Sequence, residues 1–176
     1  STIIGSSTDG EIENAKVKNG EVVISFSCFK NTTLKSTIME RDSYSDFELG
    51  EKIAKELIGS KSKVLILFSD GIHTNGENLL RGVNQVTNIV VAGGLAGDNG
   101  NFQETFVFNK DKIITNGVVG VTLNSDNLIV HTGFGFNWQG IGKVMRVTKA
   151  KDNIVYEIDG KKAVDIYRYY FGDVIA

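Results

Sequence analysis

The stretch "KVLILFSDGIHTNGENLLRGVNQVTNIVVAGGLAGD", residues 63–98, predicts a strand, a helix, a second strand and a glycine-rich loop, in that order. Val64 to Phe68 is a short apolar run bounded by polar residues, which is typical of a strand buried on both faces. The helix begins near Asn75, and its apolar stripe consists of Leu79, Leu80, Val83 and Val86. Ile89 to Ala92 forms the second strand and leads directly into the loop.

The loop is rich in glycine and carries one acidic residue, Asp98. Its glycines are Gly93, Gly94, Gly97 and Gly100. Glycine permits positive φ and a close approach of the backbone, although it loses much entropy on folding. The run therefore indicates either a turn that no other residue could make or a surface that another molecule approaches.

Outside this stretch the sequence predicts two more helices and further strands. Ser45 and Glu48 form a capping box for a helix that Gly59 closes, and another helix begins near Lys161. The further strands are predicted at residues 2–4, 22–26, 106–108, 118–123, 128–131, 144–147 and 154–156. So few helices cannot cover both faces of that much sheet. We therefore predict a mixed α/β (α+β) fold with two packed mixed β-sheets and helices outside.

The sequence contains a weak internal repeat. "TIIGSSTDGE" lines up with "IVVAGGLAGD", and "NGEVVISF" lines up with "NGVVGVTL". In the second repeat, about residues 60–135, a strand and a helix precede the glycine loop, whereas the first repeat, about residues 1–45, begins at its loop-bearing strand. We expect residues 1–176 to form one domain with an incomplete first repeat, as a fragment of a longer chain.

Composition excludes several classes of protein. A net charge of −2 argues against a nucleic-acid partner. No apolar run reaches the roughly 20 residues that cross a bilayer, and no signal-peptide pattern opens the chain. The single cysteine, Cys28, lies in the apolar run "VVISFSCF", which indicates a buried, reduced thiol. We expect a cytoplasmic protein without a membrane partner.

Two loops are candidate ligand sites. The first consists of Gly93, Gly94, Gly97 and Asp98. A carboxylate beside free backbone N–H groups suits a zwitterion such as an amino acid, whose ammonium would meet Asp98 and whose carboxylate would meet the amides. The equivalent loop of the first repeat adds Ser7, Thr8 and Asp9. A tight turn between sheets explains the first loop equally well, and Asx and hydroxyl turns explain the second without a ligand.

The remaining candidates are aromatic or titratable side chains. Trp138 could form the wall of a pocket, although tryptophan more often packs in a core. His73 and His131 are the only histidines, and no zinc-type spacing is present, so we predict no metal site. Haem needs one axial histidine, so haem remains open as a cofactor. No nucleophile motif appears, and we predict no catalytic residues and no enzyme activity.

Several motifs in a specific order carry a resemblance to a known family. They are "IIGSSTDGEI", "AGGLAGD", "NGVVGVTL", "HTGFGFNWQGIGKVMRVTKA" and "NIVYEIDGKKAVDIYRYY". Together they resemble the N-terminal part of the FIST domain, a sensory module of signal-transduction and F-box proteins. Ser6 stands where the family has a cysteine, which puts cysteine-dependent chemistry in doubt, and Gln139-Gly140 replaces a stretch where a proline is expected.

The resemblance implies a ligand-binding sensory domain of a signal-transduction protein, with small molecules such as amino acids as ligands and a signalling protein or output domain as partner. It also implies a C-terminal FIST portion, which this sequence does not contain. Some members of the family bind haem as gas sensors, which is one alternative. An enzyme that acts on a small polar metabolite and a protein-interaction module are the others. Turnover of a bound ligand would distinguish an enzyme from a sensor, and a stable complex without any small molecule would favour the interaction module.

Overall fold

The computed structural model describes residues 1–133, 135, 139–140 and 142–172. The chain divides into two compact units, Ser1–Thr132 and Gly133–Ala176. Each unit is described by itself below.

The first unit is built on a four-stranded sheet with the order β4-β9-β5-β6. The strands are β4 (Thr33–Glu40), β5 (Ser62–Ser69), β6 (Val90–Leu95) and β9 (Gly117–Asn124). β5 and β6 are parallel, and β9 pairs antiparallel with both β4 and β5. The sheet is therefore mixed, and the carboxyl ends of β4, β5 and β6 lie at the same end of the sheet.

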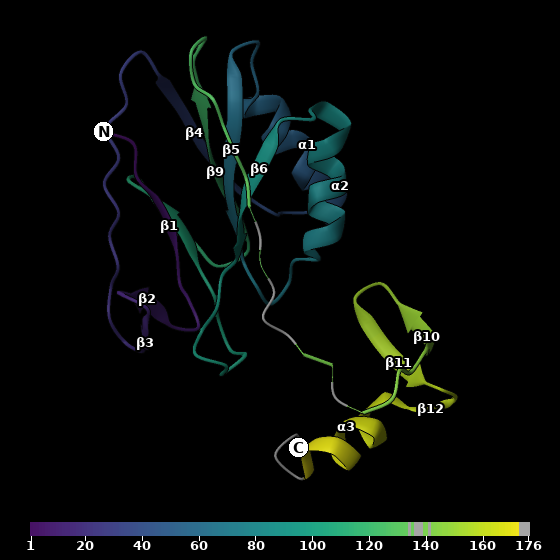
Figure 1. Cartoon of the computed structure of the whole chain (residues 1–176). Coiled ribbons are helices and arrows are strands. Elements are labelled where there is room, and N and C mark those ends of the chain that lie inside the picture. The colour runs from purple at the N-terminus through teal and green to yellow at the C-terminus, as the bar shows by residue number, and fades with distance from the viewer. Residues whose placement is uncertain (134, 136–138, 141, 173–176) are drawn as a thin grey trace. The chain divides into compact units, whose positions relative to one another are not determined.

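Two helices cover one face of this sheet (Figure 1). Helix α1 (Asp46–Leu57) begins with the predicted capping box of Ser45 and Glu48, and α2 (Gly76–Val86) is capped by the side chain of Asn75. Their apolar stripes pack on β5 and β9 in a core of Leu49, Ile53, Ala54, Leu57, Leu65, Leu67, Leu79, Val83 and Val118. The amphipathic spacing that predicted these helices is thus the spacing that buries them.

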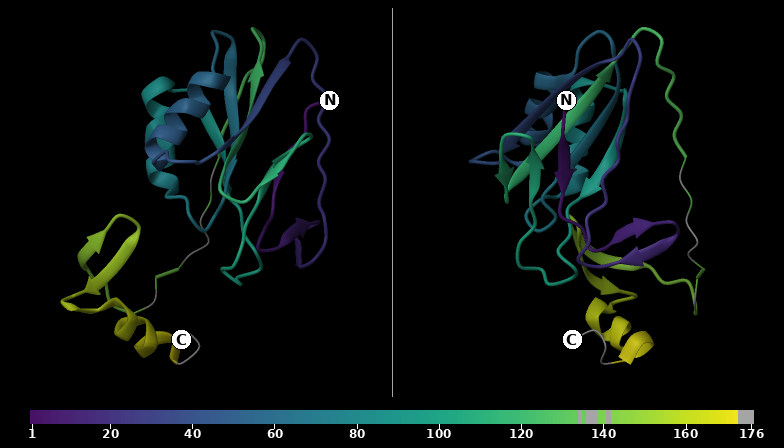
Figure 2. Two further views of the ribbon diagram at one scale, coloured as in Figure 1. Left: turned by 180° about the vertical axis from the view of Figure 1, so that it is seen from behind. Right: turned by 90° about the vertical axis from the view of Figure 1, so that its left-hand side faces the viewer.

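A second, antiparallel sheet packs on the opposite face, as Figures 1 and 2 show. Its strands are β1 (Ile4–Ser6), β7 (Val107–Asn109) and β8 (Ile113–Ile114), in the order β1-β7-β8. Side chains alternate along β9, so Val118 faces the helices and Val119 faces this second sheet. The predicted mixed α and β class is confirmed, although the second sheet is antiparallel rather than mixed. The internal repeat stays a prediction.

The smaller elements are short and exposed. A hairpin of β2 (Glu11–Glu13) and β3 (Lys16–Lys18) follows β1 in the first unit. The second unit contains β10 (Val147–Lys151), β11 (Ile154–Ile158), β12 (Lys161–Lys162) and α3 (Ala163–Phe171). Its strands form one antiparallel sheet in the order β10-β11-β12.

Several sequence predictions about strands were wrong. Residues 22–26 and 128–131 are not strands, and the predicted strand at 144–147 instead begins at Val147. Cys28 is exposed rather than buried. The sequence analysis also missed β4, whose polar and charged residues concealed an eight-residue edge strand. An edge strand needs only one apolar face, so its composition resembles that of a loop.

Candidate functional site

Three loops meet at the end of the sheet where β4, β5 and β6 have their carboxyl ends. The β5 loop begins at Asp70, the β6 loop at Ala96, and the chain after β1 continues through Ser7 to Asp9. The Gly71 amide donates to the Thr105 hydroxyl at 2.9 Å, which joins the first two loops. Carboxyl ends of parallel strands are the usual place for ligands in α/β sheets. The geometry of each loop therefore decides what this end of the sheet can bind.

The structure brings Ser7 and Asp9 together with Gly97 and Asp98. The Gly97 amide donates to the Ser7 carbonyl at 3.1 Å. The Asp9 Oδ1 atom accepts the Asp98 amide at 2.8 Å and the Gly100 amide at 3.2 Å. A Cβ atom at Gly97 would collide with the Asp9 carboxylate, so this glycine is required by the contact between the two loops.

The Asp98 carboxylate holds its own loop. It accepts the backbone amides of Phe102 at 3.0 Å, Gln103 at 2.7 Å and Glu104 at 3.3 Å. These hydrogen bonds, that of Gln103 above all, lower the pKa of Asp98. The amides of Asp98, Gly100 and residues 102–104 are thus donors to protein carboxylates, and the Gly97 amide donates to a carbonyl.

The Thr8 side chain also bonds within its own loop, which follows β1. Its hydroxyl donates to Glu11 Oε1 at 2.8 Å and lowers the pKa of that carboxyl group. The Gly10 amide approaches the same hydroxyl at 3.4 Å. This is the turn chemistry that the sequence analysis gave as the alternative to a ligand site.

Gly93 and Gly94 lie apart from this cluster, in β6. They line a groove of about 180 Å³ between β6 and α2. Its other lining residues are Leu67, Ser69, Gly76, Leu79, Leu80, Val91, Ala92 and Leu95. A Cβ atom at Gly93 would collide with the Leu67 carbonyl, whereas a Cβ atom at Gly94 would meet nothing within 4 Å. The groove is therefore lined mainly by apolar residues.

Sequence reasoning missed a buried ionic cluster beside the groove. The Asp70 side chain has 0% exposure, and its Oδ2 atom lies 3.5 Å from Arg41 Nη2. Arg41 Nη1 also donates to Asp46 Oδ1 at 2.5 Å, at the start of α1. The Thr74 hydroxyl donates to Asp70 Oδ2 at 2.7 Å, which ties the chain that leads into α2. The only signal in the sequence was an aspartate directly after a buried strand.

His73 joins this cluster through both its backbone and its ring. Its amide donates to Asp70 Oδ1 at 2.7 Å, and ring atom Nδ1 lies 3.1 Å from the same oxygen. Burial raises the pKa of Asp70, but the hydrogen bonds from His73 and Thr74 and the charge of Arg41 outweigh it, so the pKa is lowered. The imidazole itself is 56% exposed. Asp70 thus remains ionised and fixes the start of α2.

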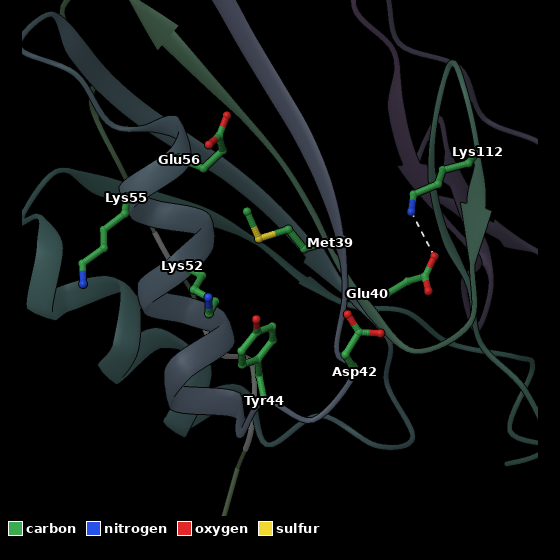
Figure 3. A pocket seen from close by; sticks show the side chains of 8 residues that line it. All are labelled: Met39, Glu40, Asp42, Tyr44, Lys52, Lys55, Glu56 and Lys112. Carbon is green, nitrogen blue, oxygen red and sulfur yellow. Dashed lines mark hydrogen bonds and ion pairs between the residues drawn. The ribbon is translucent and has the colours of Figure 1, made fainter.

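A larger hollow of about 620 Å³ lies beside the edge strand β4 (Figure 3). Charged side chains of both signs line it, and Lys112 forms an ion pair with Glu40 at 2.9 Å. Lys52 lies 4.2 Å from the centre of the Tyr44 ring. None of the predicted ligand residues lines this hollow. Its open, charged walls are typical of a solvated surface.

Two other candidate side chains are Trp138 and His131. Trp138 lies outside the described residues. His131 is exposed and is not in a strand. Among the described residues, no three His, Cys, Asp or Glu side chains gather as metal ligands, and no helix is long and apolar enough to span a bilayer.

Comparison with known proteins identifies the family. The model of the FIST N domain matches residues 1–161. The chain belongs to the FIST N domain family. FIST domains are sensory domains, so the sequence resemblance is confirmed at this level. The FIST N domain described here is also similar to the uncharacterized protein MJ1623 of Methanocaldococcus jannaschii, with 26% identity over 180 residues.

That alignment covers 94% of this FIST N domain and 34% of the archaeal protein. The chain thus spans about one third of the length of the curated relative that it matches. No solved structure matches the chain.

Proposed function

We propose that this FIST N domain is the input part of a signalling protein and binds a small molecule in the groove between β6 and α2. The observation that supports the proposal is the groove itself, whose walls on β6 and α2 are apolar. Its volume of about 180 Å³ is below the roughly 300–1,000 Å³ that is usual for drug-sized ligands. A single amino acid matches this size.

The polarity of the groove favours an amino acid with an apolar side chain. Leu79, Leu80 and Leu95 supply apolar surface for that side chain. At Gly76 the groove reaches the first residue of α2, where the first N–H groups of a helix have no partner inside the helix. These groups and the helix dipole favour a carboxylate. Leucine combines both features and is the ligand that we propose to test first.

Calorimetric titration with leucine tests this proposal, with glutamate and glycine as comparison ligands. We expect leucine to bind, glutamate to bind less because its side-chain charge would lose water, and glycine to bind less because it lacks the apolar group. Gly76→Val should weaken leucine binding at least tenfold by filling the groove, because a Cβ atom at Gly76 would lie 3.6 Å from the Leu95 side chain inside it. Gly59→Val is the control, because a Cβ atom there meets nothing within 4 Å and Gly59 lies outside the groove. Equal leucine affinity in Gly76→Val and wild type would exclude the groove.

A sensory role, as opposed to an enzymatic one, requires a separate test of what happens to the bound ligand. A sensor returns its ligand unchanged, whereas an enzyme converts it. Mass spectrometry of leucine after long incubation with the protein should therefore find leucine alone. Any stoichiometric excess of a leucine-derived product over protein would show turnover and favour an enzyme.

A further inference from the structure

One buried hydroxyl group of the first unit lacks a hydrogen-bond partner. The polar or charged residues that are buried in the described part of the chain are Ser62, Ser69, Asp70, Thr74, Thr105, Thr122 and Ser125. The side chain of each of them except Ser69 forms at least one hydrogen bond. Ser69 is 2% exposed, and its hydroxyl group has no partner among the described residues. Native structures rarely bury a polar side chain in this way, so this hydroxyl group requires an explanation.

The Ser69 hydroxyl group faces the groove between β6 and α2. Side chains alternate along β5, so Ser69 points to the same face of the sheet as Leu65 and Leu67, which pack against the helices. Every side-chain nitrogen or oxygen of the described residues that is fully shielded from solvent has a hydrogen-bond partner. The Ser69 hydroxyl group has none, so it belongs to the small part of this residue that solvent still reaches. Because Ser69 lines the groove, the groove is where the hydroxyl group is open.

The neighbours of Ser69 on this face are apolar. In the ladders of the sheet, Ser69 is opposite Leu95 of β6 and Val118 of β9. Neither side chain can form a hydrogen bond with a hydroxyl group. A serine at this position therefore destabilises the unliganded protein relative to a small apolar residue. A residue that breaks a packing rule without a gain in stability is expected where a ligand supplies the missing partner.

A second donor without an acceptor lies in the same groove. Gly76, the first residue of α2, lines the groove. Asn75 caps the helix by accepting the Asn78 amide, and the Gly76 amide has no acceptor among the described residues. Of the described residues that line the groove, none is charged, and only Ser69 has a polar side chain. A hydroxyl group and a helix N-terminus that both lack an acceptor favour an anionic acceptor such as a carboxylate.

We infer that the Ser69 hydroxyl group donates a hydrogen bond to the carboxylate of the ligand and thereby selects for apolar molecules that carry a carboxylate. The inference rests on the proposed binding of a small molecule in the groove between β6 and α2. The apolar group of the ligand lies against Leu79, Leu80 and Leu95. The ligand ammonium has no part in this contact, so a carboxylate without an amine should use Ser69 in the same way.

Calorimetric titration with two probes tests this contact. Leucine carries a carboxylate and an ammonium, whereas isocaproate has the same apolar group and carboxylate but no ammonium. Ser69→Ala should weaken the binding of both probes by a similar factor of about tenfold or more, the usual effect of losing a hydrogen bond to a charged group. Ser62→Ala is the matched control and should leave both affinities unchanged. Ser62 is a buried serine of the same strand, lies outside the groove, and donates to Asn124 Oδ1 at 2.6 Å.

The outcomes separate this inference from the proposed function. Equal affinities of Ser69→Ala and wild type for both probes would overturn the inference and leave the groove as the binding site. A loss for leucine alone would also overturn it, because the hydroxyl group would then accept from the ammonium. Binding of isocaproate but not leucine, with a loss in Ser69→Ala, would support the inference and remove the amino acid as the ligand. If wild type binds neither probe, both the inference and the proposed function fall.

The stability of the unliganded protein gives a second readout. Ser69→Ala should raise the midpoint of urea unfolding, because it removes an unpaired buried hydroxyl group. Ser62→Ala should lower the midpoint, because it removes a hydroxyl group that is paired. A group that serves a ligand thus has opposite effects on stability and on binding. A loss of stability in Ser69→Ala as large as that in Ser62→Ala would show that the protein itself satisfies this hydroxyl group, and would overturn the inference.

Discussion

Removal of the Asp70 carboxylate should destabilise the first unit strongly. The Arg41 side chain is only 14% exposed, and its Nη2 atom lies 3.5 Å from the Asp70 carboxylate. Asp70→Ala removes that carboxylate and leaves the guanidinium without this partner. The His73 amide and the Thr74 hydroxyl lose their acceptors at the same time. Breaking a buried pair by removing one partner costs about 3–5 kcal/mol of unfolding free energy. Total stabilities are about 5–15 kcal/mol, so Asp70→Ala could fail to fold.

Asp70→Asn is the variant to measure, because it keeps the shape and removes the charge. We expect a loss of about 1.5–3 kcal/mol, the usual worth of a hydrogen bond to a charged group. Urea unfolding followed by circular dichroism at the helix band reports mainly on α1 and α2. Asp126→Asn is the control, because Asp126 pairs with Lys61 at the surface, with 67% exposure of its side chain, and should cost under about 1 kcal/mol.

The pH dependence of the unfolding free energy gives a second test of the buried charge. The pKa of Asp70 is lower in the folded protein than the roughly 3.9 of an unfolded aspartate. Its contribution is therefore complete above about pH 4 and is lost as the pH falls through the folded pKa. Wild type should lose more stability than Asp70→Asn below about pH 4. Equal losses in the two proteins, or a loss in Asp70→Asn no larger than in Asp126→Asn, would refute the role of the buried charge.

Two further predictions concern the loop and the helix pair. Asp98→Asn should speed hydrogen exchange at residues 102–104, because their amides lose a charged acceptor, and should leave leucine affinity within about twofold; unchanged exchange would contradict this role. Gly82→Ala should lower the unfolding free energy although alanine is the better helix former by about 1 kcal/mol, because its Cβ atom would collide with the Phe47 carbonyl and force α1 and α2 apart. Urea unfolding that shows Gly82→Ala to be more stable than wild type would contradict the close crossing.

The sequence predicted best the elements whose own residues carry the evidence. The capping box at Ser45 and the apolar stripe of α2 are local patterns, and both helices begin where these patterns place them. β5 and β9 are buried on both faces, so their continuous apolar runs identified them. β4 was missed because its partner, β9, lies about 80 residues away in sequence, and pairing at that distance leaves no local pattern.

The two loops could be singled out from their glycines and acidic residues, but their contacts could not be predicted. The two acidic loops were expected to be equivalent, and the structure joins them through Asp9 and the amides of Asp98 and Gly100. Whether a carboxylate accepts a ligand ammonium or its own backbone depends on loop geometry, which composition does not encode. The same limit applies to Arg41 and Asp70, which only the sheet brings together.

The glycines of residues 93–100 do not all have the same physical reason. Gly97 is needed because another loop, through Asp9, occupies the space of a side chain. Gly94 lies in β6, and a Cβ atom there would meet nothing within 4 Å, so no contact inside the described fold requires this glycine. The amides around Asp9 and Asp98 already donate to protein carboxylates, whereas the groove beside β6 is an apolar hollow of about 180 Å³. We therefore place the ligand in the groove and assign Asp9 and Asp98 to the turn.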